Sequence, residues 1–151
     1  MSSLALAAAL VGISTTAVVY GTDVFSALVL RPAPADASDA AVADFLGRVH
    51  HYGDRRLPVP GVTAILAATI AVIASTTTTS RVGALLALLS WLAIYLRVSA
   101  PINRRLRAAA VTGTVPGDIR AWQLRWDSVI WPRAALQALT LGGLLVTAVT
   151  S

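Results

Sequence analysis

Ile119-Arg-Ala-Trp-Gln-Leu-Arg-Trp-Asp-Ser-Val-Ile-Trp-Pro-Arg133 begins a stretch that continues, without another charged residue, to Val149. Three of the four tryptophans lie within residues 119–133. At about 1.5 Å per residue, residues 119–149 predict a helix about 45 Å long, which exceeds the roughly 30 Å hydrocarbon core of a bilayer. We therefore expect the apolar part to cross a membrane and the Arg- and Trp-rich third to project into the interface or cytosol. Pro132 removes one helical hydrogen bond, so a kink is expected there.

The composition is that of a membrane protein. Of the 151 residues, 56% are hydrophobic and 13% are charged, with a mean hydropathy of +0.73, whereas soluble domains carry about 25% charged residues. The net charge of +5 comes from arginines dispersed between apolar segments, which predicts orientation in a membrane rather than nucleic-acid binding. The chain has no cysteine, which excludes disulfides, iron–sulfur clusters and thiolate metal ligands.

Three more apolar segments precede the last one and complete the predicted fold. They cover residues 4–30, 59–75 and 82–98. Residues 38–52 predict an amphipathic helix that is too short and too charged to span and therefore lies at the interface or folds against the bundle. Residues 76–80 predict a tight polar turn. We predict an all-α fold, an integral membrane four-helix bundle with a short interfacial helix between helices 1 and 2, which forms one domain over residues 1–151.

Turn-forming residues set the predicted helix ends. Gly53-Asp54-Arg55-Arg56 ends the short helix, and Pro58 and Pro60 introduce the second span, because proline is tolerated in a first helical turn. The third span runs to about Val98 and reaches the stretch from Pro101 to Arg107, after which residues 112–117 form a loop. The first apolar segment has no basic region before it and is longer than the core of a signal peptide. We therefore expect it to be retained as a transmembrane helix.

Arginines set the predicted orientation. The connections after the first and third spans hold nearly all of them, whereas the turn between the second and third spans has only Arg81. The positive-inside rule predicts that the protein lies in the cell (inner) membrane with its basic connections in the cytoplasm and both termini on the outer side.

This topology places the intramembrane polar groups at one level. Asp23 lies late in the first span, Tyr95 and Arg97 late in the third, and Arg133 early in the fourth. Charges at membrane depth cost about 2.5–3.5 kcal/mol and normally face the interior of a bundle or a water-filled cavity. Aromatic residues near this level are Tyr20, Trp91, Trp126 and Trp131.

Two interpretations of these groups remain open. In the first, Asp23 and Arg133 form a structural ion pair, Arg97 snorkels to the surface, His50 and His51 are exposed on the short helix, and the tryptophans anchor the interface. In the second, the groups form one pocket. An imidazole is then a general base, a buried arginine holds an anion, and aromatic rings bind an aromatic substrate.

The chain contains three motifs, which are Pro101-Ile102-Asn103-Arg104-Arg105-Leu106, the Trp-x6-Arg element from Trp126 to Arg133, and His51-Tyr52-Gly53-Asp54-Arg55 followed by Pro58-x-Pro60. They resemble the anthrone oxygenase-like family of small four-helix membrane proteins, catalogued as a domain of unknown function. The resemblance covers most of the chain at the level of layout. The chain departs from the family pattern just before Arg133, where Ile130-Trp131-Pro132 replaces an expected polar residue, often His or Asn.

The resemblance implies a monooxygenase that oxidises an aromatic or polyketide-like substrate with O2 and needs no other cofactor and no metal. The implied partners are the lipid bilayer and a hydrophobic aromatic small molecule, with no nucleic acid. The candidate catalytic residues are His50, His51, Arg133 and Asp23. The candidate substrate-binding residues are Tyr95, Arg97, Asn103, Trp126, Trp131, Tyr20 and Trp91.

Two other functions are compatible with the sequence. A haem or metal could be ligated by His50 or His51, because membrane bundles bind haem between helices. Alternatively, the protein is a non-enzymatic accessory membrane subunit. Small residues such as Gly142 and Gly143 permit close helix packing and hence a homo-oligomer.

Overall fold

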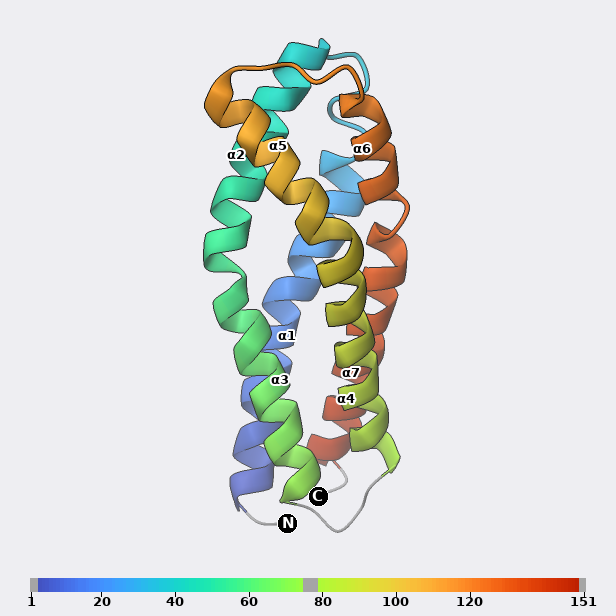
Figure 1. Ribbon diagram of the computed structural model, residues 1–151. Helices are drawn as coiled ribbons and strands as arrows, with labels where there is room; N and C mark the ends of the chain where they lie inside the picture. The colour runs from blue at the N-terminus through green and yellow to red at the C-terminus, as the bar shows by residue number, and fades with distance from the viewer. Residues whose placement is uncertain (1–2, 75–78, 150–151) are drawn as a thin grey trace.

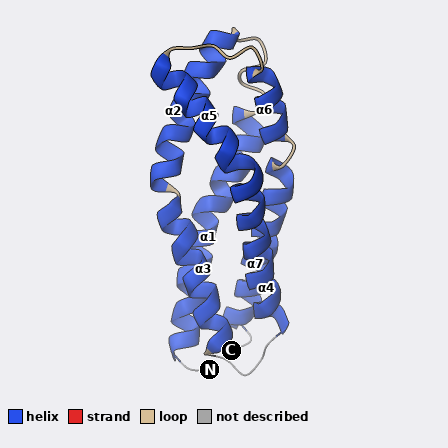
Figure 2. Ribbon diagram, viewed as in Figure 1, coloured by secondary structure: helices blue, strands red, loops and turns tan. Residues whose placement is uncertain are grey.

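The computed structural model describes residues 3–74 and 79–149, and all regular structure within these ranges is helical (Figures 1 and 2). The predicted turn at residues 76–80 falls largely outside them, and α4 already begins at Thr79. The elements are α1 (Ser3–Phe25) with a following π-helical turn (Ser26–Leu30), α2 (Asp39–Arg56), α3 (Pro58–Ile73), α4 (Thr79–Ile94) with a following π-helical turn (Tyr95–Ser99), α5 (Ala100–Thr112), α6 (Ile119–Asp127) and α7 (Ile130–Val149).

Three helical stretches of the described residues are long and apolar enough to cross a membrane. They are Ser3–Leu30, Arg81–Thr112 and Ile119–Val149. Helices α2 and α3 meet at an angle of 41° and would supply a fourth span if the bent pair is counted as one. The prediction of membrane-length apolar helices at both ends of the chain is therefore confirmed.

Two helices run further than their expected bounds. The third continues past Val98, because the π-helical turn passes directly into α5 and Pro101 lies in the first turn of α5, a position where a missing N–H is tolerated. The short helix, expected to run to about residue 52, continues to Arg56. Only Leu57 then separates it from α3, because Pro58 is also acceptable in a first helical turn.

Four helices pack along one another in one half of the molecule. Helix α1 contacts α3 and α7, and α4 contacts α7 and, less extensively, α3. In the other half, α2 packs on α5, and α6 lies beside them (Figure 1). The N-terminal end of α1 and the C-terminal end of α7 lie together at the end opposite α2, α5 and α6 (Figure 1).

The buried apolar residues form two separate clusters. One, which includes Leu106 and Ile130, joins α2, α5 and α6 to the start of α7. The other, which includes Val19 and Leu88, lies among α1, α3, α4 and α7. On α1, the buried Asp23 lies between residues of the two clusters, so the polar site described below separates two apolar cores.

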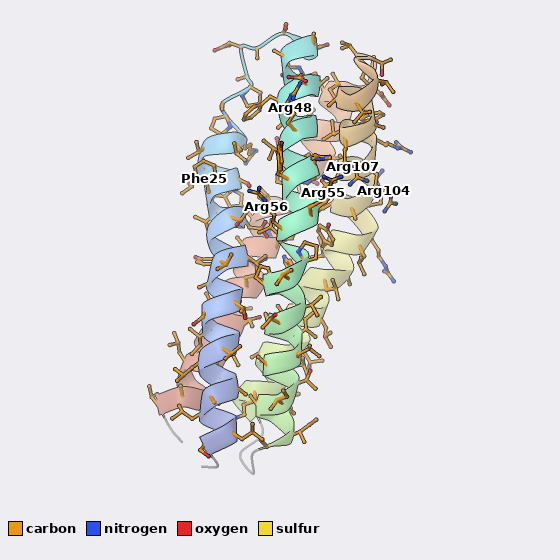
Figure 3. All side chains as sticks on the ribbon, turned by 90° about the vertical axis from the view of Figure 1, so that its left-hand side faces the viewer. Phe25, Arg48, Arg55, Arg56, Arg104 and Arg107 are labelled. Carbon is orange, nitrogen blue, oxygen red and sulfur yellow. The ribbon has the colours of Figure 1, made fainter. Side chains whose placement is uncertain are left out.

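Arginines gather at the α2–α5 end of the molecule. Figure 3 shows Arg48, Arg55 and Arg56 on α2 and Arg104 and Arg107 on α5, all in the half away from the termini of the chain. This half therefore carries a strongly basic surface next to the apolar spans.

The predicted interruption near Pro132 is confirmed. Helix α6 ends at Asp127, α7 begins at Ile130, and Ser128 and Val129 form a turn between them. The break includes Ser128, four residues before Pro132. Proline has no backbone N–H, so Pro132 cannot donate a helical hydrogen bond to the carbonyl group of Ser128.

Gly47 lets α2 lie directly against α5. A Cβ atom at this position would stand 2.6 Å from the carbonyl oxygen of Leu106 and would also collide with the Cβ of Ala110. Because the obstacle is backbone, Gly47→Ala must push the two helices apart, and we expect it to lower the free energy of unfolding by about 1–3 kcal/mol. Thermal unfolding in detergent measures this effect.

Gly21→Ala is the matched control for that measurement, because a Cβ atom at helical Gly21 would meet nothing within 4 Å. It should leave stability unchanged or raise it by up to about 1 kcal/mol, since alanine is the better helix former. Equal unfolding temperatures for the two variants would contradict the close α2–α5 packing.

Candidate functional site

A buried ion pair ties α1 to α7. The Nη2 of Arg133 donates to Oδ1 of Asp23 at 2.8 Å, and the two residues are 5% and 3% exposed. The other Asp23 oxygen accepts from Nε2 of Gln137 at 2.9 Å and, more weakly, from Nε1 of Trp91 at 3.4 Å. Arg133 also donates from Nη1 to the hydroxyl of Ser99 at 2.8 Å. The ion pair that one of the two interpretations of the sequence required is therefore present, and it also contacts Trp91 of α4 and Ser99 of the turn that follows α4.

A second carboxylate organises the groups nearer the basic end. Oδ1 of Asp54 accepts from the hydroxyl of Tyr95 at 3.0 Å and from Nδ2 of Asn103 at 2.9 Å. The side-chain oxygen of Asn103 in turn accepts from Nε1 of Trp126 at 3.0 Å. Arg107 lies 3.8 Å from the other Asp54 oxygen. This chain of contacts joins α2, α5 and α6 through uncharged donors.

Aromatic rings surround the Arg133 guanidinium. Its central carbon lies 5.6 Å from the ring centre of Tyr95 and 5.9 Å from those of Trp91 and Trp126. Trp91 and Tyr95 stack with their ring centres 6.1 Å apart, and the ring of His50 lies 5.3 Å from that of Trp126. Cation–π contact is attractive and stronger in desolvated sites, so the rings help to hold this buried cation.

A cavity of about 530 Å³ lies against these two polar groups. Its wall is mostly apolar and comes from α1, α2, α3, α4, α6 and α7, with Asn103 from α5. Cavities of about 300–1,000 Å³ with a few convergent polar groups are typical of small-molecule sites. Those of its lining residues that were candidates from the sequence are Asp23, His50, Trp91, Tyr95, Asn103, Trp126 and Arg133.

Three residues that line the cavity have polar groups without a hydrogen-bond partner among the described residues. Nε of Arg133 and Oε1 of Gln123 are buried without a hydrogen bond. No hydrogen bond joins the ring of His50, which is 7% exposed, to another described residue. Buried polar groups are nearly always satisfied, so unpartnered donors and acceptors on a cavity wall indicate the atoms that a ligand would contact.

The environment of His50 keeps its imidazole neutral. Helix α2, which carries it, is not among the three helices that are apolar enough to span by themselves. Burial lowers the pKa of His50 to about 4, with the nearby Arg133 charge adding to the decrease and Asp54 opposing it. At pH 7 the ring is therefore uncharged and has a nitrogen lone pair available to accept a proton or a hydrogen bond.

Four candidates from the sequence lie outside the cavity wall. His51, Arg97 and Trp131 do not line the cavity, and Trp131 is 48% exposed. His51 contacts the edge of Tyr52 and borders a basic hollow between α2 and α5. Tyr20 is half-buried one turn from Asp23 but does not line the cavity. Successive side chains of a helix point about 100° apart. His51, one position after His50, and Trp131, two positions before Arg133, therefore face away from the cavity.

Sequence reasoning did not name four polar residues of the site, namely Asp54, Ser99, Gln123 and Gln137. Asp54 was expected to follow the end of a helix, whereas α2 continues past it. Gln137 had a usable signal, because it lies four residues after Arg133 in an otherwise apolar run and therefore shares its face.

Comparisons with known proteins leave the site to be argued from its geometry. No protein-family model matches the chain, and no curated protein or solved structure matches it. Within the described ranges, no group of three or more His, Cys, Asp or Glu side chains is arranged to hold a metal ion.

Proposed function

We propose that the protein is a membrane-embedded oxygenase that binds a hydrophobic aromatic molecule in this cavity and oxidises it with O2. The observation that carries the proposal is that one aromatic, largely apolar cavity is lined both by Arg133, whose Nε has no hydrogen-bond partner, and by His50, whose ring has none among the described residues. An aromatic ketone or phenol supplies an oxygen for the first group and a proton for the second. The resemblance to the anthrone oxygenase-like family favours the same chemistry.

The proposed setting is a four-helix membrane bundle. The apolar parts of α1, α3, α4 and α7 form the spans, and α2 lies at the interface as a continuation of α3. The basic α2–α5 end faces the cytoplasm and both termini face outwards, because arginine-rich connections stay on the cytoplasmic side. The cavity then lies near the cytoplasmic edge of the hydrocarbon layer, where a lipid-soluble substrate is concentrated.

The reaction begins with proton transfer from the substrate. His50 takes a proton from a ring carbon that lies next to the aromatic system, and the oxygen of the resulting enolate accepts a hydrogen bond from Nε of Arg133. Because Asp23 balances the Arg133 charge and fixes the guanidinium, the donor is in place before the substrate arrives. Asp23 is therefore a positioning residue.

O2 completes the reaction without a further cofactor. The carbanion gives its electrons to O2, a carbon–oxygen bond forms, and protonation yields a hydroperoxide. Loss of the second hydrogen on that carbon, with cleavage of the O–O bond, gives a ketone and one water. One CH2 group and one O2 thus become one C=O group and one H2O. A dry, apolar wall protects the enolate from protonation by water.

Oxygen consumption tests this proposal. Anthrone is added to the protein in lipid nanodiscs, with O2 uptake followed by an electrode and anthraquinone by its absorbance. The protein should raise the rate above that of empty nanodiscs and consume one O2 per quinone formed. Trp126→Phe should reduce the rate because Trp126 lines the cavity, whereas Trp131→Phe should not. A rate equal to that of empty nanodiscs would overturn the proposal.

A further inference from the structure

The cavity opens sideways between two helices. Most of its lining residues are buried or partly buried, but Phe25 on α1, Tyr52 and Arg56 on α2, and Pro58 and Val62 on α3 are exposed. Helix α1 has no extensive contact with α2, so these side chains border an opening between α1 and the α2–α3 junction. Figure 3 looks onto this side, with Phe25 on α1 and Arg56 on the neighbouring helix.

This opening has an apolar border with a single cationic group. Phe25 and Val62 belong to apolar helices, so a molecule can reach the opening from within a bilayer. The guanidinium carbon of Arg56 lies 5.3 Å from the ring centre of Tyr52. Among the described residues no carboxylate forms an ion pair with Arg56, whereas Arg48 on the same helix is paired with Asp44 at 2.9 Å. Arg56 is therefore a cation available to a ligand.

We infer that the ligand of this cavity is an acidic amphipath that enters from the membrane through this opening. Its carboxylate or other oxyanion binds Arg56, because guanidinium groups pair with oxyanions in a bidentate manner. Its uncharged aromatic body occupies the cavity. At the inner end the charge of Arg133 is already balanced by Asp23, whereas Arg56 has no carboxylate partner among the described residues, which sets this orientation. The substrate class rests on the proposed function, but the binding and its charge preference are independent of turnover.

The charge preference is tested with two probes of the same shape. Binding of anthracene-2-carboxylate and of anthracene-2-carboxamide is measured in phosphatidylcholine nanodiscs through energy transfer from the tryptophans. The ratio of the two affinities is compared between variants, which removes the difference in membrane partition. Arg56→Gln should reduce the preference for the acid by about tenfold or more, the size of one ionic hydrogen bond. Arg48→Gln should leave the ratio unchanged.

The route of entry is tested by narrowing the opening. Val62→Phe should slow association of both probes at least about tenfold. Leu66→Phe is the matched control, because Leu66 lies one turn further along the same face of α3, is 58% exposed against 55% for Val62, and does not line the cavity. Equal association rates in the two variants would overturn lateral entry.

The remaining outcomes are also decisive. An unchanged affinity ratio in Arg56→Gln would overturn the assignment of Arg56, and binding of neither probe to the wild type would overturn the ligand class. Because the probes are bound without turnover, an acid preference that depends on Arg56 supports the inference even if anthrone consumes no O2. Conversely, O2 consumption with no acid preference would overturn the inference alone.

Discussion

Replacing Arg133 with methionine is expected to lower the free energy of unfolding by about 3–5 kcal/mol, because it leaves a buried carboxylate without its cation. Asp23 is 3% exposed, and its remaining donors, Gln137 and Trp91, are uncharged. Thermal or denaturant unfolding in detergent, followed by tryptophan fluorescence, measures the loss. Ligand binding should be lost as well, since Nε of Arg133 is the unpartnered donor of the cavity wall.

A second substitution separates this effect from simple loss of packing. Arg133→Met combined with Asp23→Leu removes both charges, and most of the lost stability should return, because apolar replacements of a whole buried pair are often neutral. Arg97→Met, at an exposed arginine, should change stability by no more than about 0.5 kcal/mol. A double variant as unstable as Arg133→Met would contradict the ion pair as the cause.

His50→Gln is expected to lower kcat for anthrone oxidation by about 10²–10⁴-fold, the usual contribution of a general base. Glutamine is similar in size and polar but cannot take the substrate proton. His51→Gln is the natural control, because His51 is the adjacent residue but lies outside the cavity wall, and its kcat should match the wild type. Equal rates for both variants would remove His50 from the mechanism.

The pH dependence gives a separate test of the same residue. The proposed base acts in its deprotonated form, and burial lowers the pKa of His50 to about 4. The profile of kcat/KM, which reports the free enzyme, should therefore be level from about pH 8 to pH 5 and fall only as the pH approaches 4. A fall centred near pH 6.5, the value of an ordinary histidine, would show that the base is more exposed than His50.

Much of the fold follows from hydropathy and length. The run at 4–30 carries one charge, Asp23, and the run at 119–149 carries none after Arg133, so both predict helices long and apolar enough to cross a membrane. The helix ends were harder to predict. Pro58 was expected in a first helical turn and lies there, but Pro101 also lies in a first turn, that of a helix that directly continues the third apolar segment. Local sequence does not distinguish a proline that ends one helix from a proline that begins the next.

The sequence predicted the level of the candidate site along the helices but not which helix faces form it. Up-and-down helices put Asp23, Tyr95 and Arg133 at one level, and the structure joins the first and last directly. Which side of a helix faces inwards depends on packing, so His50 and His51 could not be separated from sequence alone. Asp54 could not be assigned because its role depends on α2 continuing past Gly53.

The cavity itself had no sequence signal. It exists because α2 leaves the line of α3 at a bend of 41° and packs on α5, away from α1. Its volume is set by several helices at once, and no single stretch of sequence carries that information.

The most direct test of the central claim is the ¹⁵N resonance of Arg133 Nε, measured by NMR in detergent micelles and assigned by its loss in Arg133→Lys. Titration with anthraquinone, which offers carbonyl oxygens in an aromatic body, should shift this resonance as the unpartnered Nε gains an acceptor, and the shift should saturate with the binding curve. An Arg133 Nε resonance that stays in place while anthraquinone binds would contradict the assignment of this cavity as the functional site.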